Sequence, residues 1–285
     1  MGLGGYLTWT SVAREIATRI GVSNVKVLPV ETYNGGVFRI IKSEIFKNNP
    51  YILQEITESV HCFPMVLNDP NVNYCKRDTP TQATHRYDKH MIHQYYEHYG
   101  IQSNKLKCEL YFTKEEIENV NNIMLSLPEE FVTIEPQSND EYCVNKKYPT
   151  EKWQLVVNDL VEKGINVVQV GRKTEEHNLK NVIDLSGQTS FREAGLVIKK
   201  SNVFISTDGG LMHAANAVST PAVIVYTGFI HPRLTCYPEN TNMWIGSDHG
   251  PCGMKSFCQK CFDGANSHDH SEVTKEVLKL LEKIG

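Results

Sequence analysis

The sequence predicts an α/β protein with two domains, the second of which contains a parallel β-sheet. From about Phe131 onward, short apolar runs alternate with amphipathic segments, which is the pattern of strands joined by helical crossovers. The 285 residues suit two domains of roughly 130 to 150 residues each. Hydrophobic residues make up 40% of the chain and charged residues 22%, so we expect it to fold throughout. We place the domain boundary near Pro128, which gives domains of residues 1–128 and 129–285.

The first domain is predicted from a few segments with recognisable patterns. A glycine-rich turn that leads into a helix is predicted for GLGGYLTWTSVAREIATRIG, and strands are predicted for VKVLPV and, more weakly, PYILQEI. The segment from His85 to Gly100 is predicted to be a polar helix rich in histidine and tyrosine. Another helix is predicted in FTKEEIENVNNIMLSLPEE, where Thr113 caps the first turn and Glu116 completes a capping box.

The second domain is predicted to alternate strands and helices regularly. We expect strands at FVTIEP, INVVQVG, VIDLS, VFIST and AVIVYTG, and helices at PTEKWQLVVNDLVEKG, SFREAGLVIKKS and LMHAANAV. Ser190 is the expected N-cap of the second helix, and Gly164 lies just past the end of the first. Such crossovers predict a parallel sheet that is covered on both faces. The first helix is expected to have an apolar side made of Trp153, Leu155, Val156, Leu160 and Val161.

A polar, glycine-rich turn follows the strand VFIST and leads into a helix. Ligands of open parallel sheets bind at the carboxyl ends of strands, where the first N–H groups of helices attract anions. Gly209 and Gly210 allow the backbone to approach a ligand closely, and Asp208 can accept hydrogen bonds from hydroxyl groups. These features favour a phosphate attached to a sugar. A structural alternative, in which Asp208 caps the helix and the glycines form a tight turn, fits the motif equally well.

Two more strand ends carry polar residues. The turn QSNDEYCVNKKYP offers the hydroxyl of Ser138 to a phosphate and the charge of Lys146 or Lys147. The turn VGRKTEEH offers Glu175 or Glu176 to ribose hydroxyls, although pairs of lysines or glutamates are usually exposed surface when taken alone. The glycines of GLGGYLTWT lack the full dinucleotide fingerprint, because no strand precedes them and no third glycine follows at the required spacing. The sequence therefore disfavours a dehydrogenase.

The charge balance and the apolar pattern exclude several classes of protein. The chain has 29 basic and 33 acidic side chains and a net charge of −4 without strong asymmetry, so no nucleic-acid partner is expected. No apolar run approaches the ~18 residues of a membrane span, and no signal peptide precedes the first motif. We therefore expect a cytoplasmic protein, in at most peripheral contact with the inner membrane.

Cysteines cluster near the end of the chain. There are eight in all, and a cytoplasmic location favours reduced thiols or metal ligands over disulfides. Thiolates at Cys-x2-Cys spacing can bind one tetrahedral metal ion, so we predict a structural metal site without a catalytic role. Reduced thiols packed without a metal are the equally weighted alternative. The candidate ligands are Cys252, Cys258 and Cys261, with Cys236, His268 or His270 as the fourth.

Several of these segments, taken in order, resemble glycosyltransferase family 9, the bacterial heptosyltransferase family. The resemblance rests on GLGGYLTWTSVAREI, THRYDKHMIHQYYEHYGI, EPQSNDEYCVNKKYPTEKW, the long run GQTSFREAGLVIKKSNVFISTDGGLMHAANAVSTPAVIVYTG and the cysteine-rich tail. It implies a GT-B fold, in which two Rossmann-like domains with parallel sheets face a cleft and the second domain holds a nucleotide-sugar donor. The implied reaction is an inverting, metal-independent transfer of a sugar, typically a heptose from an ADP-linked donor.

The resemblance also assigns roles to residues that match the family motifs. Asp208 matches the aspartate that binds the donor, and His213 matches the histidine after the turn, for which burial within the helix is the structural alternative. Some relatives that modify proteins bind iron near their cysteines, so the ion expected here is zinc or iron. The remaining expected donor contacts are Gly209, Gly210 and Leu211 for the diphosphate, Ser138 and Lys146 for phosphate, and Glu175, chosen over Glu176, for the ribose.

Two features depart from the family pattern. The family has an aspartate as general base where this chain has Gly5, and it has a buried strand before that loop, so we expect a reduced first domain. Tyr6 is a poor substitute for the base at its ordinary pKa. His85, Asp88 and His90 lie on a segment that can face the cleft, and the sequence does not decide among them.

These departures leave three hypotheses for the function. The first is a glycosyltransferase whose acceptor is a glycan, a lipid-linked glycan or a protein. The second is a GT-B protein that binds the donor but is inactive because it lacks the aspartate at Gly5. The third is a GT-B sugar-nucleotide epimerase or hydrolase, which would need acid and base carboxylates that the sequence does not indicate.

Overall fold

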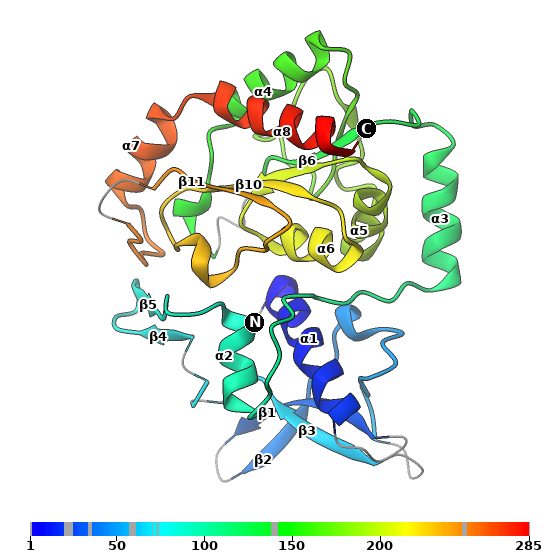
Figure 1. The fold of residues 1–285 in the computed structure, drawn as a ribbon, viewed down its shortest axis with the longest axis vertical. Helices are drawn as coiled ribbons and strands as arrows, with labels where there is room; N and C mark the ends of the chain where they lie inside the picture. Colours follow the sequence, from blue (N-terminus) through cyan, green and yellow to red (C-terminus); the bar gives the residue numbers. More distant parts are fainter. Residues whose placement is uncertain are drawn as a thin grey trace.

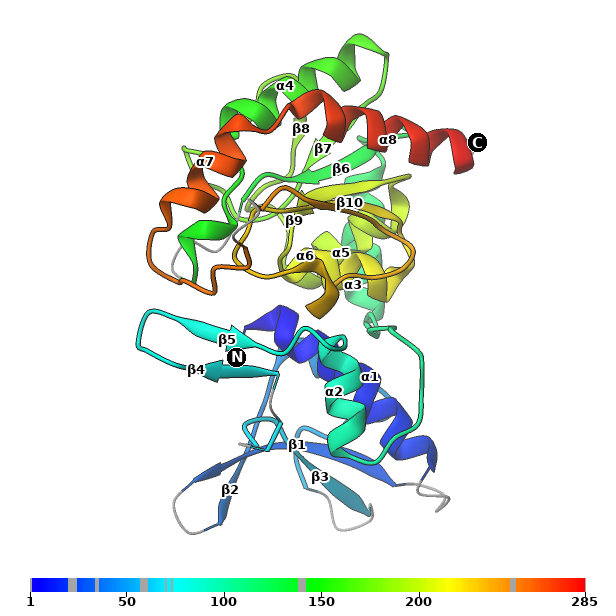
Figure 2. The ribbon, with the colours of Figure 1, turned by 60° about the vertical axis from the view of Figure 1, so that its left-hand side comes forward.

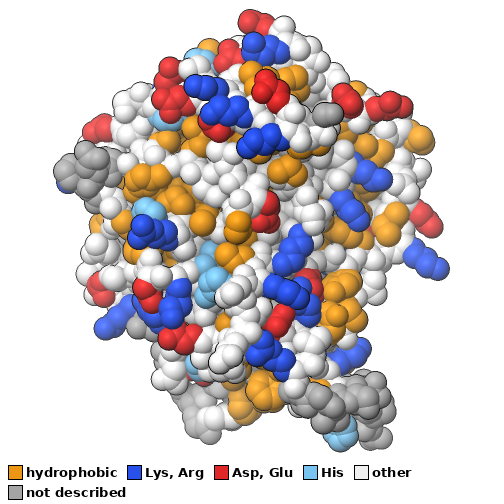
Figure 3. All heavy atoms as spheres, in the orientation of Figure 1, with side chains coloured by type: hydrophobic (Ala, Val, Ile, Leu, Met, Phe, Trp, Pro, Cys, Tyr) orange, Lys and Arg blue, Asp and Glu red, His pale blue; other side chains and the backbone are white. Residues whose placement is uncertain are grey.

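Two lobes are stacked on each other in the computed structural model, which describes residues 2–19, 25–33, 36–56, 61–69, 71–72, 74–137, 142–246 and 250–284 (Figure 1). The chain up to α2 (Met91–His98) forms the lower lobe of Figure 1, and the second half forms the upper lobe, with α3 (Lys114–Met124) beside it. No helix within these ranges is long and apolar enough to cross a membrane. On the face drawn in Figure 3, basic and acidic side chains are interspersed, as the balanced charge predicts.

The first lobe is built around helix α1 and a small sheet. Helix α1 already begins at Leu3, so Gly4 and Gly5 lie in its first turn and the expected glycine-rich turn before the helix is wrong. The elements of this half are α1 (Leu3–Arg19), β1 (Lys26–Tyr33), β2 (Val37–Ile40), the 3-10 turn η1 (Glu44–Phe46), β3 (Cys62–Val66), β4 (Cys75–Arg77), β5 (Ala83–His85), α2 (Met91–His98) and α3 (Lys114–Met124).

The sheet of the first lobe is mixed, whereas a parallel one was expected. Its order is β2-β1-β3, and β1 pairs parallel with β3 but antiparallel with β2. The antiparallel pair arises because β2 follows β1 after a short connection, which cannot carry a crossover. The strand predicted at PYILQEI is absent from the described residues there, and only Ile52 forms a bridge, to Val27. Strand β3 was missed because Pro64 lies within its short run, and a proline argues against a strand except at the edge of a sheet, where β3 lies.

The second lobe contains a six-stranded parallel sheet of order β11-β10-β9-β6-β7-β8. Numbered within the lobe, this is the order 3-2-1-4-5-6 of the Rossmann fold, which reverses direction between β6 and β9. The elements are β6 (Val132–Glu135), η2 (Val144–Lys146), α4 (Thr150–Glu162), β7 (Val167–Gln169), β8 (Ile183–Asp184), α5 (Phe191–Lys200), β9 (Phe204–Thr207), α6 (Gly210–Val218), β10 (Ala222–Tyr226), η3 (Pro232–Leu234), β11 (Thr241–Trp244), α7 (Gln259–Ser267) and α8 (His270–Ile284).

Helices cover both faces of this sheet, as the alternating pattern predicts (Figure 2). Helices α4 and α8 pack on one face, and α5 and α6 lie on the other, toward the first lobe, where α6 contacts α1. Trp153, Val156 and Leu160 of α4 are fully buried against the sheet, as expected. Leu155 and Val161 are exposed, so their predicted burial is wrong, and Val157 takes the remaining buried position. The buried set follows the three- and four-residue spacing of one helix face.

The predicted helix boundaries hold in most cases. Thr113 and Ser190 both form capping boxes, with Glu116 and Glu193 respectively. The exceptions are α1, which begins within the predicted glycine-rich turn, and the segment predicted to be helical from His85. That residue lies in β5, and α2 begins only at Met91.

A buried arginine joins the two lobes. Arg192 of α5 is 1% exposed, and its Nε and Nη2 donate to the Glu116 carboxylate of α3 at 2.7 and 2.9 Å. Its Nη1 also donates to the carbonyl of Glu44 in the first lobe, at 3.0 Å. Residues of α1, α2, α5 and α6 belong to one continuous apolar cluster. The lobes therefore share a core as well as the hydrogen bond from Arg192 to Glu44.

Candidate functional site

The candidate site lies at the topological switch point of the second sheet, where the turn after β9 leads into α6. Gly209 is the N-cap of α6, and no described side chain caps this helix, so its first N–H groups have no side-chain acceptor among the described residues. A Cβ on Gly210 would lie 3.0 Å from Cε2 of Phe191 and 3.7 Å from the backbone N of Gly4. Phe191 of α5 therefore packs tightly against the start of α6, and a Cβ on Gly4 of α1 would lie 3.0 Å from the Cα of Gly210.

Asp208 and Lys146 form an ion pair beside this turn. The Asp208 residue is 4% exposed and the Lys146 side chain is 15% exposed. The Lys146 Nζ donates to the Asp208 carboxylate and to its backbone carbonyl, the latter at 3.3 Å. Burial alone would lower the pKa of Lys146, but the adjacent Asp208 carboxylate raises it above its ordinary value. The site thus holds one ammonium charge whose position is set by the predicted aspartate.

Aromatic rings contact Lys146, and hydrogen bonds fix the residue before it. Its Nζ lies 5.6 Å from the ring centroid of Tyr142 and 5.5 Å from that of Phe229, within the range of cation–π attraction. The preceding residue, Asn145, accepts a hydrogen bond from the Cys258 backbone N at 2.8 Å and donates to the Ser256 carbonyl at 2.7 Å. The cysteine-rich segment therefore supports the loop that positions the ammonium group.

Glu135 lies at this candidate site but is not among the residues predicted from the sequence. It ends β6 next to β9, and its Oε2 accepts a hydrogen bond from Ser206 Oγ at 3.3 Å. Burial raises the pKa of its carboxyl to about 7. The sequence does contain an indication of this residue. An acidic residue at the end of a buried apolar strand such as FVTIE is unusual and points to a polar site.

The other predicted donor contacts differ in where they lie relative to this turn. Ser138 lies outside the described residues. Glu175 is exposed on the loop between β7 and β8, while Glu176 pairs with Lys147 at the surface. The side chain of Leu211 is buried in the core, so only its backbone faces the turn.

His213 is buried at the contact between the lobes. Its Nδ1 lies 2.6 Å from the hydroxyl of Tyr237, which is in turn 3.1 Å from the Cys108 sulfur. Burial lowers the pKa of His213 to about 3, so the ring is neutral. Its Cδ2 lies 3.0 Å from where a Cβ on Gly4 would be. These contacts fit the structural alternative, a histidine that fixes α6 against α1.

The first lobe brings only some of the base candidates toward this turn. Gly5 is in the first turn of α1, where its carbonyl accepts from Thr8. The ring of Tyr6 packs against Phe46 at 5.4 Å, and burial raises the pKa of its hydroxyl further. The Asp88 carboxylate is half exposed and accepts from both Nε and Nη2 of Arg86, which lowers its pKa.

Of the two histidine candidates, His85 contacts the aromatic ring beside Lys146. Its ring is 5.9 Å from that of Phe229, the same ring that Lys146 contacts. Burial, with smaller effects of Lys146 and Lys255, lowers the pKa of His85 to about 4, so the ring is neutral at pH 7. His90 is 5% exposed and caps α2, where its Nδ1 accepts from a backbone N–H.

A hairpin from the first lobe carries His85 onto the second lobe. The Ala83 backbone N donates to the Gly253 carbonyl at 2.9 Å, and the Lys255 backbone N donates to the Thr81 carbonyl at 2.7 Å. Gly253 has a φ of +62°, and a Cβ there would lie 2.2 Å from the Ala83 carbonyl oxygen. The β4–β5 hairpin is therefore bound by main-chain hydrogen bonds to the cysteine-rich segment.

Three of the four predicted cysteines come together. The thiols of Cys252, Cys258 and Cys261 lie within 4.8 Å of one another, and the first and last are 3.3 Å apart. Among the described residues, Cys236 is not part of this group, so its prediction as a ligand is wrong for this geometry. His268 and His270 point elsewhere, toward Tyr148 at 3.0 Å and Asp159 at 3.4 Å. Three soft thiol ligands fit zinc or iron.

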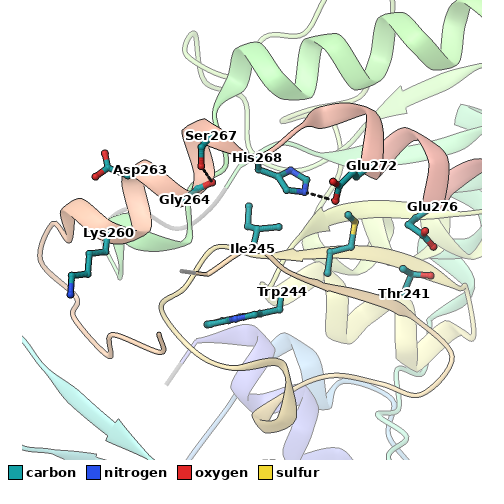
Figure 4. Close-up of a pocket in the computed structure, with 11 residues that line it drawn as sticks. Thr241, Trp244, Ile245, Lys260, Asp263, Gly264, Ser267, His268, Glu272 and Glu276 are labelled. Carbon is teal, nitrogen blue, oxygen red and sulfur yellow. Dashed lines mark hydrogen bonds and ion pairs between the residues drawn. The ribbon is translucent and has the colours of Figure 1, made fainter. Parts of the chain in front are cut away.

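A separate hollow of ≈ 680 Å³ lies at the sheet edge between β11, α7 and α8 (Figure 4). The residues predicted to bind the donor do not line it. Its walls combine Met243, Trp244 and Ile245 with charged groups such as Lys260 and Glu276. It is therefore distinct from the turn at Asp208.

Comparison with known proteins identifies relatives of this chain. The sequence model of glycosyltransferase family 9 (heptosyltransferase) matches residues 81–263. Lipooligosaccharide heptosyltransferase 2 of Haemophilus ducreyi is 29% identical over 30% of this chain and 28% of its own. Lipopolysaccharide heptosyltransferase 3 of Escherichia coli K12 is 25% identical over 43% of this chain and 38% of its own. The chain thus matches only about a third of the length of these curated relatives.

Solved structures with low sequence identity share the fold. The iron-containing dodecameric glycosyltransferase TibC of enterotoxigenic Escherichia coli aligns with a TM-score of 0.67 and 16% identity, over 100% of this chain and 75% of TibC. The TibC complex with ADP-D-β-D-heptose aligns with a TM-score of 0.56 and 18% identity, over 79% and 60%. These similarities confirm the expected GT-B architecture.

Proposed function

The chain belongs to glycosyltransferase family 9, and from this premise we propose that it transfers a heptose from an ADP-linked donor to a hydroxyl acceptor. The observation that carries the proposal is the uncapped start of α6 at the sheet switch point, next to the ammonium group of Lys146. An anion site in this position is where doubly wound sheets bind nucleotides. The ADP-heptose complex of the structural relative TibC supports this choice of donor.

In this proposal, the donor diphosphate binds the backbone N–H groups of Gly209, Gly210 and Leu211. Lys146 supplies the compensating charge, and Asp208 holds Lys146 in place and accepts from sugar hydroxyls. Ser138 is a further proposed phosphate contact. Glu175, which is exposed on the loop after β7, remains the proposed ribose contact.

We propose His85 as the general base in place of the aspartate expected at Gly5. A neutral imidazole can accept the proton of the acceptor hydroxyl, and the pKa of about 4 keeps His85 neutral at pH 7. Asp88 is the weaker candidate because two hydrogen bonds from Arg86 occupy its carboxylate.

The chemical step follows from these positions. The acceptor oxygen attacks the anomeric carbon from the face opposite the diphosphate while His85 takes its proton. The bond between the anomeric carbon and the diphosphate oxygen breaks, and ADP leaves with inverted configuration in the product. Lys146 and the α6 N–H groups stabilise the charge that develops on the leaving oxygen. No cofactor takes part in this step.

We further propose that Cys252, Cys258 and Cys261 hold a structural zinc or iron ion. When bound, the ion would crosslink the start of α7 to the segment that docks the β4–β5 hairpin. Support comes from the grouped thiols and from the iron in TibC. Elemental analysis of protein purified without an affinity-tag metal should give about one ion per chain, and a value near zero would contradict the site.

The proposed function is tested with a panel of nucleotide sugars, by measuring nucleotide release with and without an acceptor. We expect release from ADP-heptose only when the acceptor is present. Candidate acceptors are a glycan such as the lipopolysaccharide core, a lipid-linked glycan and a protein. Release without an acceptor would indicate a hydrolase or epimerase. Binding without release would indicate the second candidate, an inactive donor-binding protein, which the replacement of the aspartate by Gly5 favours.

A further inference from the structure

The carboxyl group of Glu135 lies beneath the proposed donor turn. Its Oε2 is 3.8 Å from where a Cβ on Gly209 would be, and its Oε1 is 3.4 Å from the corresponding position on Gly171. Gly171 has a φ of +108° and follows β7, so Glu135 lies between two turns at strand ends. The Glu135 residue is half-buried, so part of its surface is accessible. A ligand bound at the start of α6 would therefore lie next to this carboxyl group.

The groups around Glu135 do little to stabilise a negative charge. From β9, Ser206 offers a neutral hydroxyl at 3.3 Å, and from the loop after β7 the charge of Arg172 has a smaller effect. At the donor turn, Asp208 is negative and its cation, Lys146, is already paired with it. Burial is the largest effect, and it raises the pKa of Glu135 to about 7.

We propose that Glu135 controls donor affinity, because its neutral carboxyl donates a hydrogen bond to the donor diphosphate and its ionised form repels that anion. This inference rests on the proposed function, since it assumes a diphosphate at Gly209 and Gly210. A carboxyl group can serve an anion site in this way only when protonated. The donor would then bind only the protonated protein, so above the pKa of Glu135 binding would be coupled to the uptake of a proton from solvent.

Another role would make Glu135 an ionised acceptor for ribose hydroxyls. That role requires a stabilised carboxylate, and the described surroundings offer one hydroxyl and a distant guanidinium group. The two roles predict opposite effects of Glu135→Gln, because the amide keeps a hydrogen-bond donor but loses the charge.

The test is a calorimetric titration of ADP-heptose at about pH 6 and about pH 8.5. The diphosphate diester has no proton to lose in this range, so changes in affinity report on the protein. With a pKa near 7, the neutral fraction of Glu135 falls from about 0.9 to about 0.03, so wild-type Kd should rise by up to about 30-fold. Glu135→Gln should bind equally at both pH values, close to the wild-type affinity at low pH.

Two further variants complete the design. Glu162→Gln removes an exposed carboxylate of α4 and should keep the wild-type pH dependence. Ser206→Ala leaves Glu135 in place but removes its hydrogen bond, so the midpoint of the pH dependence should move to higher pH. This shift provides a test even if Glu135→Gln folds poorly.

The outcomes separate this inference from the proposed function. If Glu135→Gln keeps the wild-type pH dependence, or weakens binding at both pH values, the inference is wrong and the donor site stands. An unchanged midpoint in Ser206→Ala would also contradict it. If wild-type protein binds no ADP-heptose at either pH, the proposed donor is wrong and the inference falls with it.

Discussion

At the scale of single residues, the site depends on a few charges placed in a buried turn. Asp208 and Lys146 neutralise each other where the surroundings exclude most water, so neither can be removed without leaving the other unpaired. Glu135 lies near them without a cation within hydrogen-bond range among the described residues. His85 approaches from the opposite lobe with a neutral ring. In the proposed site, the donor side is thus polar and charged, while the candidate base on the acceptor side, His85, is neutral.

Replacing Lys146 by methionine should impair both stability and donor binding. It leaves the Asp208 charge buried without its partner, which should cost about 3 kcal/mol of unfolding free energy. It also removes the cation for the diphosphate, so donor affinity should fall at least about tenfold. Denaturant titration and calorimetry measure the two effects. Lys147→Met, which removes a surface ion pair, is the control, and an equal effect of both variants would contradict the assignment.

Replacing His85 by alanine should slow the chemical step with little change in donor KM. Loss of a general base typically lowers kcat by about 10²- to 10⁴-fold. Asp88→Asn should leave kcat within about twofold, because that carboxylate already pairs with Arg86 in solvent. Steady-state kinetics with ADP-heptose would measure both. The opposite ranking of the two variants would assign the base to Asp88.

The raised pKa of Glu135 predicts how stability depends on pH. In the unfolded chain its pKa is about 4.3, whereas in the folded protein it is about 7. Between these values the folded state holds more protons, so this group lowers stability as the pH rises from about 4.3 to about 7. The unfolding free energy of Glu135→Gln minus that of wild type should therefore be more favourable to the variant at pH 8 than at pH 5. A stability difference that is equal at both pH values would show that the native pKa is ordinary.

At the scale of elements, the sequence predicts the second lobe much better than the first. Every strand and helix expected after Phe131 is present, because a parallel sheet buried on both faces produces continuous apolar runs. The strands of the first lobe are short or half exposed, and β2, β3, β4 and β5 have no such signal. The contacts between site residues could not be predicted either. Lys146 and Asp208 are 62 residues apart in the sequence, and no pattern in the sequence indicates that they form an ion pair.

The docked hairpin yields a prediction at this scale. Gly253→Ala should detach the β4–β5 hairpin, because the new Cβ would lie 2.2 Å from the Ala83 carbonyl oxygen. Activity should fall, since His85 loses its support. Gly164→Ala is a matched control, with a similar φ of +77° and no described atom within 4 Å of its Cβ. Hydrogen exchange of residues 81–85 should increase in the first variant only, and equal protection in both would contradict the docking.

At the scale of the whole molecule, the two lobes are held together by a shared core and by hydrogen bonds from the buried Arg192. Arg192 reaches from α5 to Glu116 and to carbonyl groups of the first lobe. The N-terminal half of α1 packs against α6, so the two lobes meet beside the donor turn. Thermal unfolding is therefore expected to occur in one transition for both lobes.

The ion pair can be tested by a double-mutant cycle. Arg192→Met should lower the unfolding free energy by about 3 kcal/mol, because it leaves Glu116 partly buried without its cation. Adding Glu116→Gln should restore much of that loss, since glutamine keeps the capping box with Thr113 but carries no charge. Denaturant titrations of both single variants and of the double variant measure the cycle, and losses of the two single variants that add up to the loss of the double variant would mean that the pair contributes no coupling.

The central claim is that the donor binds at the switch point of the second sheet, and a crystal structure of the complex with ADP-heptose tests it most directly. The account predicts diphosphate oxygens within about 3.2 Å of the α6 backbone N–H groups and of Lys146 Nζ, and next to the Glu135 carboxyl group. A diphosphate bound elsewhere, for example in the hollow beside Trp244, with the start of α6 unoccupied, would contradict it.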